Sequence, residues 1–309
     1  MAQNDQPDVV FLTDRNDEGG ADWRSRFGSR LLSNWKLTCG RAIFRATPWR
    51  EVGDAFARNY ISVPQDDVRF GADDCVSLVL TRARAIRTRS VLVLVHGFNN
   101  SFADALARAR AFAEDIQFKG LVVVWAWPSQ GWFYGYEDDE KAAGWTTDHF
   151  TQFMQRLLIG PSTVDVDFVA HSMGNRILLE MATVQRSKLP EFGGAYVFAA
   201  PDVAEEEFLQ KVSTQQFQTL YASADDRALQ VSARYFHAGP RAGSPGDKGI
   251  LIMNGVESID AILRGHSYVY EDPRALRDLA RLVNAHDRAS LRGLTERFRG
   301  GDRYWVINP

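Results

Sequence analysis

The residues around Ser172 have the types and the spacing expected of a nucleophilic serine. An apolar stretch at residues 164–170 leads into His171-Ser172-Met173-Gly174, and apolar residues recur at helical spacing over 175–186. A strand, a tight turn and a helix in this order hold a serine on a strained backbone with its hydroxyl exposed. Small residues two positions before and after the serine keep such a turn free of clashes, and Ala170 and Gly174 meet this requirement. We predict that Ser172 is a nucleophile; the alternative is a serine that only caps the helix.

A serine nucleophile needs a general base, and His266 has the most suitable place in the chain. Three histidines follow Ser172, namely His237, His266 and His286. His286 lies in a charged helical stretch, and His237 lies at a plausible strand end. His266 lies in a loop between the last predicted strand and the final predicted helix. We therefore predict that His266 is the base.

The carboxylate that orients the base is expected between Ser172 and His266, at the end of a strand. Asp226 heads Asp226-Arg227-Ala228-Leu229, where the chain turns from a strand into a helix, and it is the first choice. Asp202, which follows the strand at 195–199, the first strand after the helix behind Ser172, is the alternative acid. The chain order Ser, Asp, His distinguishes this arrangement from the other serine-triad orders.

The loop after the strand at 91–95 is expected to stabilise a developing oxyanion. This strand leads into His96-Gly97-Phe98-Asn99-Asn100. A backbone N–H from such a loop and the N–H of the residue after the nucleophile form an oxyanion hole. We assign these two donors to the backbones of Phe98 and Met173. His96 is interpreted as a structural histidine that holds the loop.

An aromatic segment at residues 125–136 leaves the carboxyl end of another predicted strand. Trp127, Trp132 and Tyr134 are our candidates for lining an apolar substrate pocket. The alternative is that these rings pack the N-terminal segment onto the rest of the protein.

Strand and helix patterns alternate from residue 90 onward. Apolar runs predict strands at 91–95, 121–127, 164–170, 195–199, 219–222 and 249–253. Apolar residues at helical spacing predict helices at 102–118, 145–159, 175–186 and 273–284. This alternation is typical of a doubly wound, mostly parallel α/β sheet with helices on both faces. We predict a catalytic domain at 89–309 and an N-terminal extension at 1–88, with short strands at 9–13 and 59–63, packed on it.

Composition places the chain among ordinary globular proteins. It has 309 residues, of which 45% are hydrophobic and 24% charged, and a formal charge of -3, which argues against a nucleic-acid partner. The longest apolar run, 121–127, is too short for a membrane span, and no signal peptide is visible. Cys39 and Cys75 lack the spacing of a metal site and cannot form a disulfide framework. We expect a reduced, cytoplasmic protein with no metal or other cofactor.

The motifs together resemble the α/β-hydrolase superfamily, and more narrowly a bacterial hydrolase family catalogued as a domain of unknown function. The segments that carry this resemblance are Phe11–Arg15, Ile61–Pro64, His96–Asn99, Trp127–Ser129, Ala170–Asn175, Ala200–Asp202, Asp226–Leu229 and Gly265–Tyr268. The resemblance implies the α/β-hydrolase fold and a serine triad.

The expected function is hydrolysis of carboxylic esters through an acyl-enzyme on Ser172, as in serine esterases and lipases. The partner would be a small-molecule ester or another acyl substrate. Thioesterase, amidase or acyltransferase activity with the same triad is an alternative, and so is a non-catalytic binding protein of the same fold.

Overall fold

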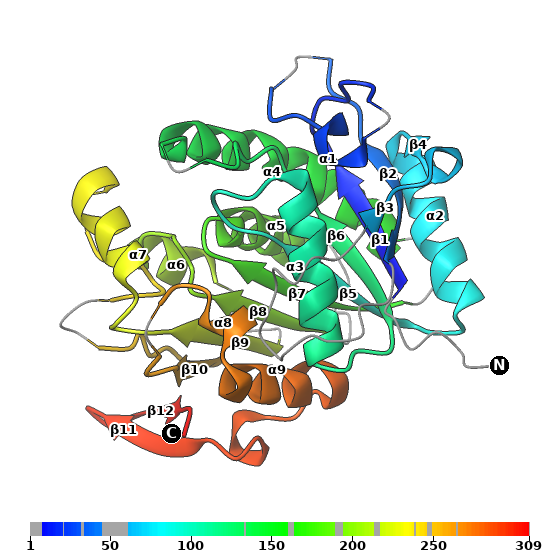
Figure 1. The fold of residues 1–309 in the computed structure, drawn as a ribbon. Coiled ribbons are helices and arrows are strands. Elements are labelled where there is room, and N and C mark those ends of the chain that lie inside the picture. Colours follow the sequence, from blue (N-terminus) through cyan, green and yellow to red (C-terminus); the bar gives the residue numbers. More distant parts are fainter. Residues whose placement is uncertain are drawn as a thin grey trace.

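One continuous sheet forms the centre of the molecule (Figure 1). The computed structural model describes residues 8–20, 22–31, 34–44, 61–132, 134–159, 164–188, 194–212, 217–237, 239–245, 249–263 and 265–308. The strands are β1 (Asp8–Thr13), β2 (Thr38–Phe44), β3 (Ile61–Ser62), β4 (Arg69–Phe70), β5 (Ser90–Val95), β6 (Leu121–Trp125), β7 (Asp165–His171), β8 (Ala195–Ala199), β9 (Phe217–Ala222), β10 (Val256–Asp260), β11 (Thr295–Arg299) and β12 (Asp302–Val306). Their order is β11-β12-β10-β9-β8-β7-β5-β6-β1-β2-β3, with β4 beside β2.

Every pairing from β12 through β1 is parallel, and antiparallel strands lie only at the two edges. The predicted mostly parallel sheet is therefore confirmed. Because parallel strands all end at the same edge, the loops that follow β5, β7, β8, β9 and β10 meet at one side of the molecule.

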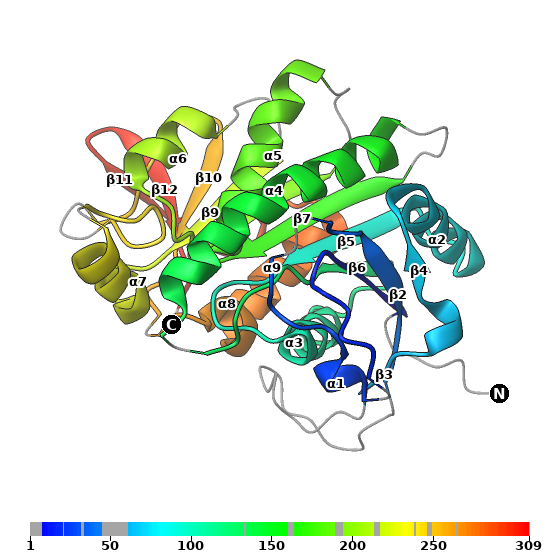
Figure 2. The same cartoon turned by 90° about the horizontal axis from the view of Figure 1, so that it is seen from above.

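Helices cover both faces of this sheet (Figure 2). They are α1 (Trp23–Arg26), α2 (Ala72–Ala85), α3 (Phe102–Asp115), α4 (Tyr136–Ile159), α5 (Gly174–Lys188), α6 (Glu205–Lys211), α7 (Arg227–Val231), α8 (Tyr268–Glu271) and α9 (Pro273–Ala285), with a π-helical turn at Ser232–Phe236. Side chains of a strand alternate between the faces, so Val91, Val93 and Val95 join the core under α4 and α5. Leu92 and Leu94 join the core under α3 and α9. No helix within the described ranges is long and apolar enough to cross a bilayer.

Two element predictions need correction. The apolar run at 249–253 is not a strand, and the last parallel strand is β10 at Val256–Asp260. Gly249 and Gly255 both have positive φ, so the backbone bends at each end of this run while Ile250 and Leu251 still enter the core. The helix predicted at 145–159 begins earlier, at Tyr136, where Glu137, Asp138 and Asp139 favour its N-terminus.

Residues from the N-terminal segment belong to the same sheet. β1 pairs in parallel with β6, and β2 pairs antiparallel with β1. The predicted strand at 9–13 therefore continues the sheet through main-chain hydrogen bonds. Of the strand predicted at 59–63, residues 59 and 60 lie outside the described residues.

Cys39 on β2 and Cys75 on α2 form a disulfide, so the prediction of reduced cysteines is wrong. Their Cα atoms lie 5.6 Å apart, within the usual range for a disulfide. Both side chains are fully buried. The sequence hid this contact because 36 positions separate the two cysteines, and only the packing of α2 on β2 brings them together.

We expect the Cys39→Ala/Cys75→Ala double variant to lose about 2–4 kcal/mol in free energy of unfolding, because the disulfide restricts the unfolded chain. Urea denaturation of both proteins measures this difference. Wild-type protein treated with reductant serves as the control and should unfold like the variant. Wild-type protein unfolded without reductant should not react with iodoacetamide, and alkylation at Cys39 and Cys75 would contradict the disulfide.

Candidate active site

Ser172 lies on a strained turn between β7 and α5, at the carboxyl edge of the sheet. Its φ is +54°, a region that residues other than glycine rarely adopt, and its exposed fraction is 4%. Ser172 N donates to Ala199 O at 3.0 Å, and Asp202 N donates to Ser172 O at 3.1 Å. The main chain after β8 thus holds the turn in the conformation expected of a nucleophile on a strand-turn-helix motif.

Two glycines allow the loop after β5 to approach this turn. A Cβ on Gly97 would lie 2.7 Å from Ser172 Cβ, and a Cβ on Gly174 would lie 2.3 Å from His96 O. Real Cβ atoms essentially never lie that close to another atom, so only glycine fits at either position without movement of the backbone. The two loops therefore form one packed unit.

Backbone strain gathers at the same edge. Among the described non-glycine residues with positive φ, four follow a strand of the central sheet, namely Asn99, Ser172, Ala200 and Ile262. Three others lie where α2, α3 and α9 end, namely Arg87, Gln117 and His286. A left-handed residue is common at a helix end, whereas strain at several strand ends is typical of a functional site.

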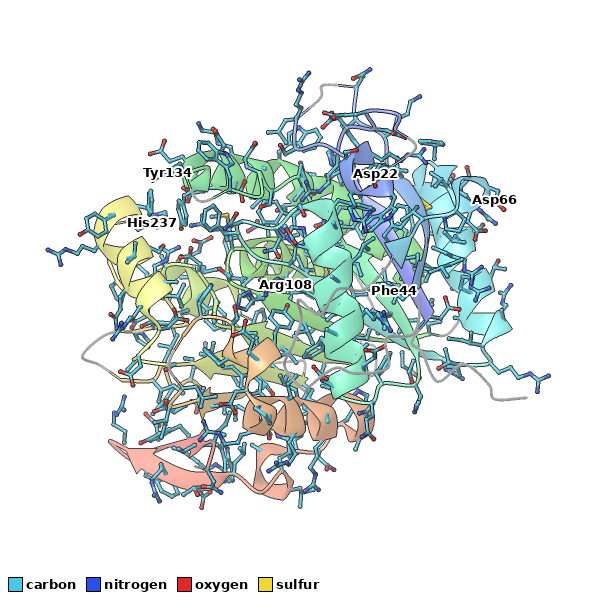
Figure 3. The ribbon with its side chains drawn as sticks, in the orientation of Figure 1. Asp22, Phe44, Asp66, Arg108, Tyr134 and His237 are labelled. Atoms are coloured by element: carbon cyan, nitrogen blue, oxygen red, sulfur yellow. A yellow bond between two sulfur atoms is a disulfide. The ribbon has the colours of Figure 1, made fainter. Side chains whose placement is uncertain are left out.

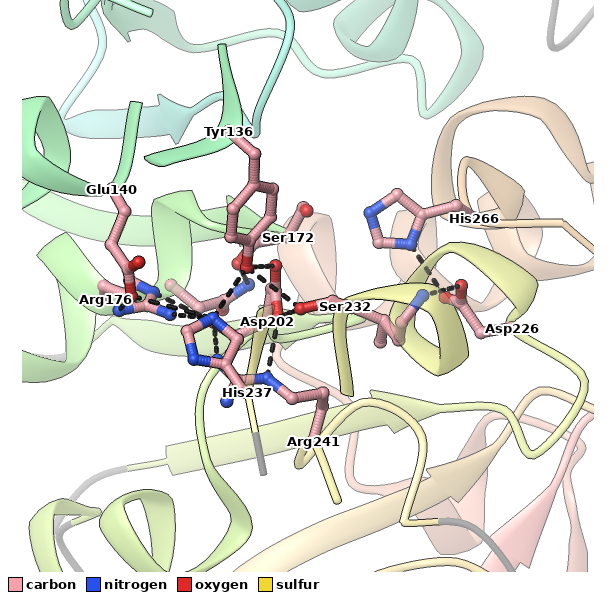
Figure 4. A network of polar contacts seen from close by, with 12 residues as sticks. Tyr136, Glu140, Ser172, Arg176, Asp202, Asp226, Ser232, His237, Arg241 and His266 are labelled. Atoms are coloured by element: carbon pink, nitrogen blue, oxygen red, sulfur yellow. Dashed lines mark hydrogen bonds and ion pairs between the residues drawn. The ribbon is translucent and has the colours of Figure 1, made fainter. Parts of the chain in front are cut away.

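His266 and Asp226 come together at this edge, as the first-choice assignment expects. Asp226 Oδ2 accepts a hydrogen bond from His266 Nδ1 at 2.8 Å (Figure 4). The Asp226 side chain is fully buried and the His266 side chain is 22% exposed. Asp226 Oδ1 also accepts from Leu229 N at 3.1 Å and so caps α7. Ser172 Oγ makes no hydrogen bond to His266 in the part of the chain that the structure describes, which is common in a site without substrate.

His171 links the nucleophile strand to the loop of His266. His171 Nε2 lies 2.9 Å from His266 O, and the two rings are 4.7 Å apart. Burial, with a further contribution from His266, lowers the pKa of His171 well below its ordinary value. A neutral His171 that carries its proton on Nε2 therefore donates to the His266 carbonyl.

The backbones assigned to the oxyanion hole flank Ser172. Met173 is buried and directly precedes α5, where N–H groups have no partner within the helix. Phe98 lies in the loop after β5, where Asn100 Nδ2 donates to Gly97 O at 3.1 Å and to Phe98 O at 2.8 Å. The two predicted donors thus belong to the two loops that the glycines bring together.

Asp139 stabilises the loop after β5, and our sequence analysis did not single it out. The Asp139 carboxylate is fully buried. It accepts hydrogen bonds from Asn99 N, Gln130 N and Ser129 Oγ. Burial raises the pKa of Asp139, while these donors stabilise its charged form. A buried acid inside an acidic run carries no sequence signal.

Arg15, at the end of β1, was also missed as part of the site. Its guanidinium donates to Ala126 O, Ser129 O and Asn100 O at 3.2, 3.0 and 2.8 Å. Burial lowers the pKa of Arg15 to about 10, so it stays positively charged at neutral pH. The only sequence signal was its presence in the Phe11–Arg15 segment.

His96 and Trp127 pack against each other behind the loop. Their rings stack 5.0 Å apart, and Trp127 Nε1 donates to His96 O at 2.7 Å. Burial lowers the pKa of His96 to about 3, so the ring is neutral, as a structural histidine would be. Trp127 is fully buried, so its predicted role in lining the substrate pocket is wrong.

The other two candidates for lining the substrate pocket are accessible to solvent. Trp132 is 53% exposed and Tyr134 is 82% exposed.

Asp202 belongs to a separate polar network and does not contact His266 (Figure 4). Its carboxylate accepts from Tyr136 OH at 2.6 Å, Ser232 Oγ at 2.7 Å and Arg241 Nε at 2.7 Å. Burial alone would raise the pKa of Asp202, but Arg241 and the two hydroxyls lower it below the ordinary value. Asp202 does not cap the next helix, because the α6 N-cap, Ala204, has no side-chain hydrogen bond.

The other two candidate histidines have different partners. His237 Nε2 lies 3.1 Å from Tyr136 OH and 3.3 Å from an Arg176 guanidinium nitrogen. His286 Nε2 contacts Asp167 Oδ1 at 2.8 Å, near the amino end of β7. Within the described ranges, no three His, Cys, Asp or Glu side chains gather as a metal-ligand set.

Comparison with known families agrees with this fold. A model of the family described as alpha/beta hydrolase of unknown function (DUF900) matches residues 76–261, and the chain belongs to this family. The protein is therefore an α/β-hydrolase. The match begins at α2, after β1 and Arg15.

Two solved structures that are similar to this chain are described as a hydrolase and an esterase. A YdeN-like hydrolase from Pectobacterium atrosepticum is 15% identical, with 68% of this chain and 97% of that chain covered and a TM-score of 0.35. A hyperthermophilic esterase from the archaeon Pyrobaculum calidifontis is 14% identical, with 64% of this chain and 74% of that chain covered and a TM-score of 0.34. A comparison with curated proteins finds no similar sequence.

We expect Asp202→Asn to lower the free energy of unfolding by about 3 kcal/mol, because it leaves the buried Arg241 without a counter-charge. Thermal unfolding followed by circular dichroism measures the loss. Asp225→Asn, at an exposed position three residues past β9, is the matched control and should melt like wild type. An unchanged melting temperature for Asp202→Asn would show that the ion pair contributes no net stability.

Proposed function

We propose that this α/β-hydrolase cleaves carboxylic esters through an acyl-enzyme on Ser172. The observation that carries the proposal is the buried Asp226 carboxylate bonded to His266 Nδ1, at the sheet edge where the strained Ser172 turn lies. A hydrogen bond at Nδ1 leaves His266 Nε2 as the free proton acceptor, which is the tautomer that a general base needs.

Each residue has a role in this mechanism. His266 Nε2 takes the proton of Ser172 Oγ as the oxygen attacks the ester carbonyl, and the backbone N–H groups of Phe98 and Met173 stabilise the oxyanion. His266 then gives the proton to the leaving alcohol, so the ester C–O bond breaks and the acyl group stays on Ser172. Water, activated by the same histidine, releases the acid. Thioesters, amides or another acyl acceptor would use the same residues.

The location of the protein is also part of the proposal. The sequence favoured the cytoplasm, but disulfides persist mainly in oxidising compartments. We propose that the protein functions outside the reducing cytoplasm with Cys39 and Cys75 joined. Alkylation of protein isolated from its native host tests this location, and free Cys39 and Cys75 thiols there would contradict it.

A fluorophosphonate probe should label wild-type protein on Ser172, because the probe forms a covalent adduct only with an activated serine. Mass spectrometry of the labelled peptides identifies the residue. Ser172→Ala is the control and should fold without being labelled. Folded wild type that resists the probe, or p-nitrophenyl acetate turnover that survives in Ser172→Ala, would overturn the nucleophile assignment and favour a binding protein.

Asp226→Asn should reduce kcat by about 10⁴-fold, as the matching change does in serine proteases, because an amide favours the wrong imidazole tautomer. Asparagine still caps a helix well, so the melting temperature should change little. Asp202→Asn should keep most of its turnover per folded molecule. A stable but inactive Asp202→Asn beside an active Asp226→Asn would instead make Asp202 the acid.

A further inference from the structure

Large apolar side chains are exposed on two segments that lie beside the candidate site. We call Trp132, Tyr134, Tyr235 and Phe236 the aromatic edge; their exposed fractions are 53%, 82%, 68% and 44%. The first two precede α4, and the last two lie on the π-helical turn after α7. Both views place α7 beside the N-terminal end of α4 (Figures 1 and 2). Figure 3 shows Tyr134 and His237 on the same side of the molecule.

Ring contacts connect Phe236, one residue of the aromatic edge, to Phe98 of the proposed oxyanion hole. Tyr136 stacks on Phe236, with ring centres 4.1 Å apart and planes 16° apart. Tyr136 also makes an edge contact with Phe98, with ring centres 5.4 Å apart. Phe98 is the residue whose N–H is assigned to the oxyanion. A series of three aromatic rings therefore runs from Phe98 through Tyr136 to the exposed Phe236.

The polar network of Asp202 fixes these rings in place. The Tyr136 hydroxyl contacts Asp202, Ser232 and His237 at 2.6, 2.9 and 3.1 Å. The π-helical turn directs Ser232 inward to Asp202, while Phe236, at the end of the same turn, covers Tyr136. π-Helical turns are frequent at functional sites. Asp202 thus supports this surface without serving the triad.

We propose that the aromatic edge binds the apolar acyl chain of a medium- or long-chain ester, an inference that rests on the proposed esterase function. Exposed apolar surface of this kind marks a binding site for apolar ligands. Tyr136 links Phe236 to Phe98, the residue whose amide would bind the ester oxygen. The acyl group extends from that carbonyl, which makes it the occupant of this surface. In this proposal Trp132 and Tyr134 remain candidates for contacting the substrate. Phe98 and Phe236 take the place of the buried Trp127 as the other candidates.

Esters of p-nitrophenol from acetate to dodecanoate test the inference, because only the acyl chain varies. In wild type, kcat/KM should rise with chain length, by up to about fourfold for each buried CH₂. Phe236→Ser should lower kcat/KM for dodecanoate about tenfold more than for acetate. Phe298→Ser is the matched control, because Phe298 is 63% exposed on β11, an edge strand of the sheet, and does not belong to the aromatic edge. Tyr235→Ser provides a second variant if Phe236→Ser does not fold.

Dodecanoate binding, measured by calorimetry, separates this inference from the proposed function. Phe236→Ser should weaken it about tenfold and Phe298→Ser should leave it unchanged, even if wild type hydrolyses no ester. Equal chain-length profiles and equal dodecanoate affinities in wild type and Phe236→Ser would overturn the inference. The inference would also be overturned if the wild-type protein were a dimer and Phe236→Ser were a monomer. In that case a second copy of the chain would cover the aromatic edge.

Discussion

The close approach of two loops at the carboxyl edge of the sheet constrains the whole candidate site. Gly97 lies against Ser172, and Gly174 lies against the carbonyl of His96, with no room for a Cβ at either position. β5 and β7 pair directly through main-chain hydrogen bonds, so the loops that follow them cannot move apart independently. Any side chain added at these glycines would displace both the Ser172 turn and the loop after β5.

Buried charges hold this strained edge in place. A residue kept in an unfavourable φ region costs about 1–3 kcal/mol, and several such residues gather at the strand ends. Arg15 and Asp139 bind the loops after β5 and β6 through main-chain groups. Asp202 and Arg241 bind each other beside the loop after β8. These polar contacts hold the loops after β5, β6 and β8, and none of them involves the His266–Asp226 pair.

Part of this support comes from outside the matched family region. Arg15 precedes residue 76, where the match to the alpha/beta hydrolase family begins, yet its guanidinium donates to the loop that contains Asn100. β1 brings Arg15 to the site because it pairs in parallel with β6, so both strands end at the same edge. The disulfide from β2 to α2 then joins the N-terminal strands to the first helix of the matched region.

The sequence by itself determined the sheet of alternating strands and helices and singled out Ser172 and His266, because those signals are local patterns of apolar periodicity and small residues. Only the tertiary structure brings Asp226, and not Asp202, into contact with His266, since both aspartates follow a strand. β9 pairs with β10, so Asp226 emerges beside the loop of His266, whereas Asp202 follows β8 and contacts Tyr136. The disulfide, the burial of Trp127 and the roles of Arg15 and Asp139 were likewise decided by contacts between distant segments, which local spacing does not encode.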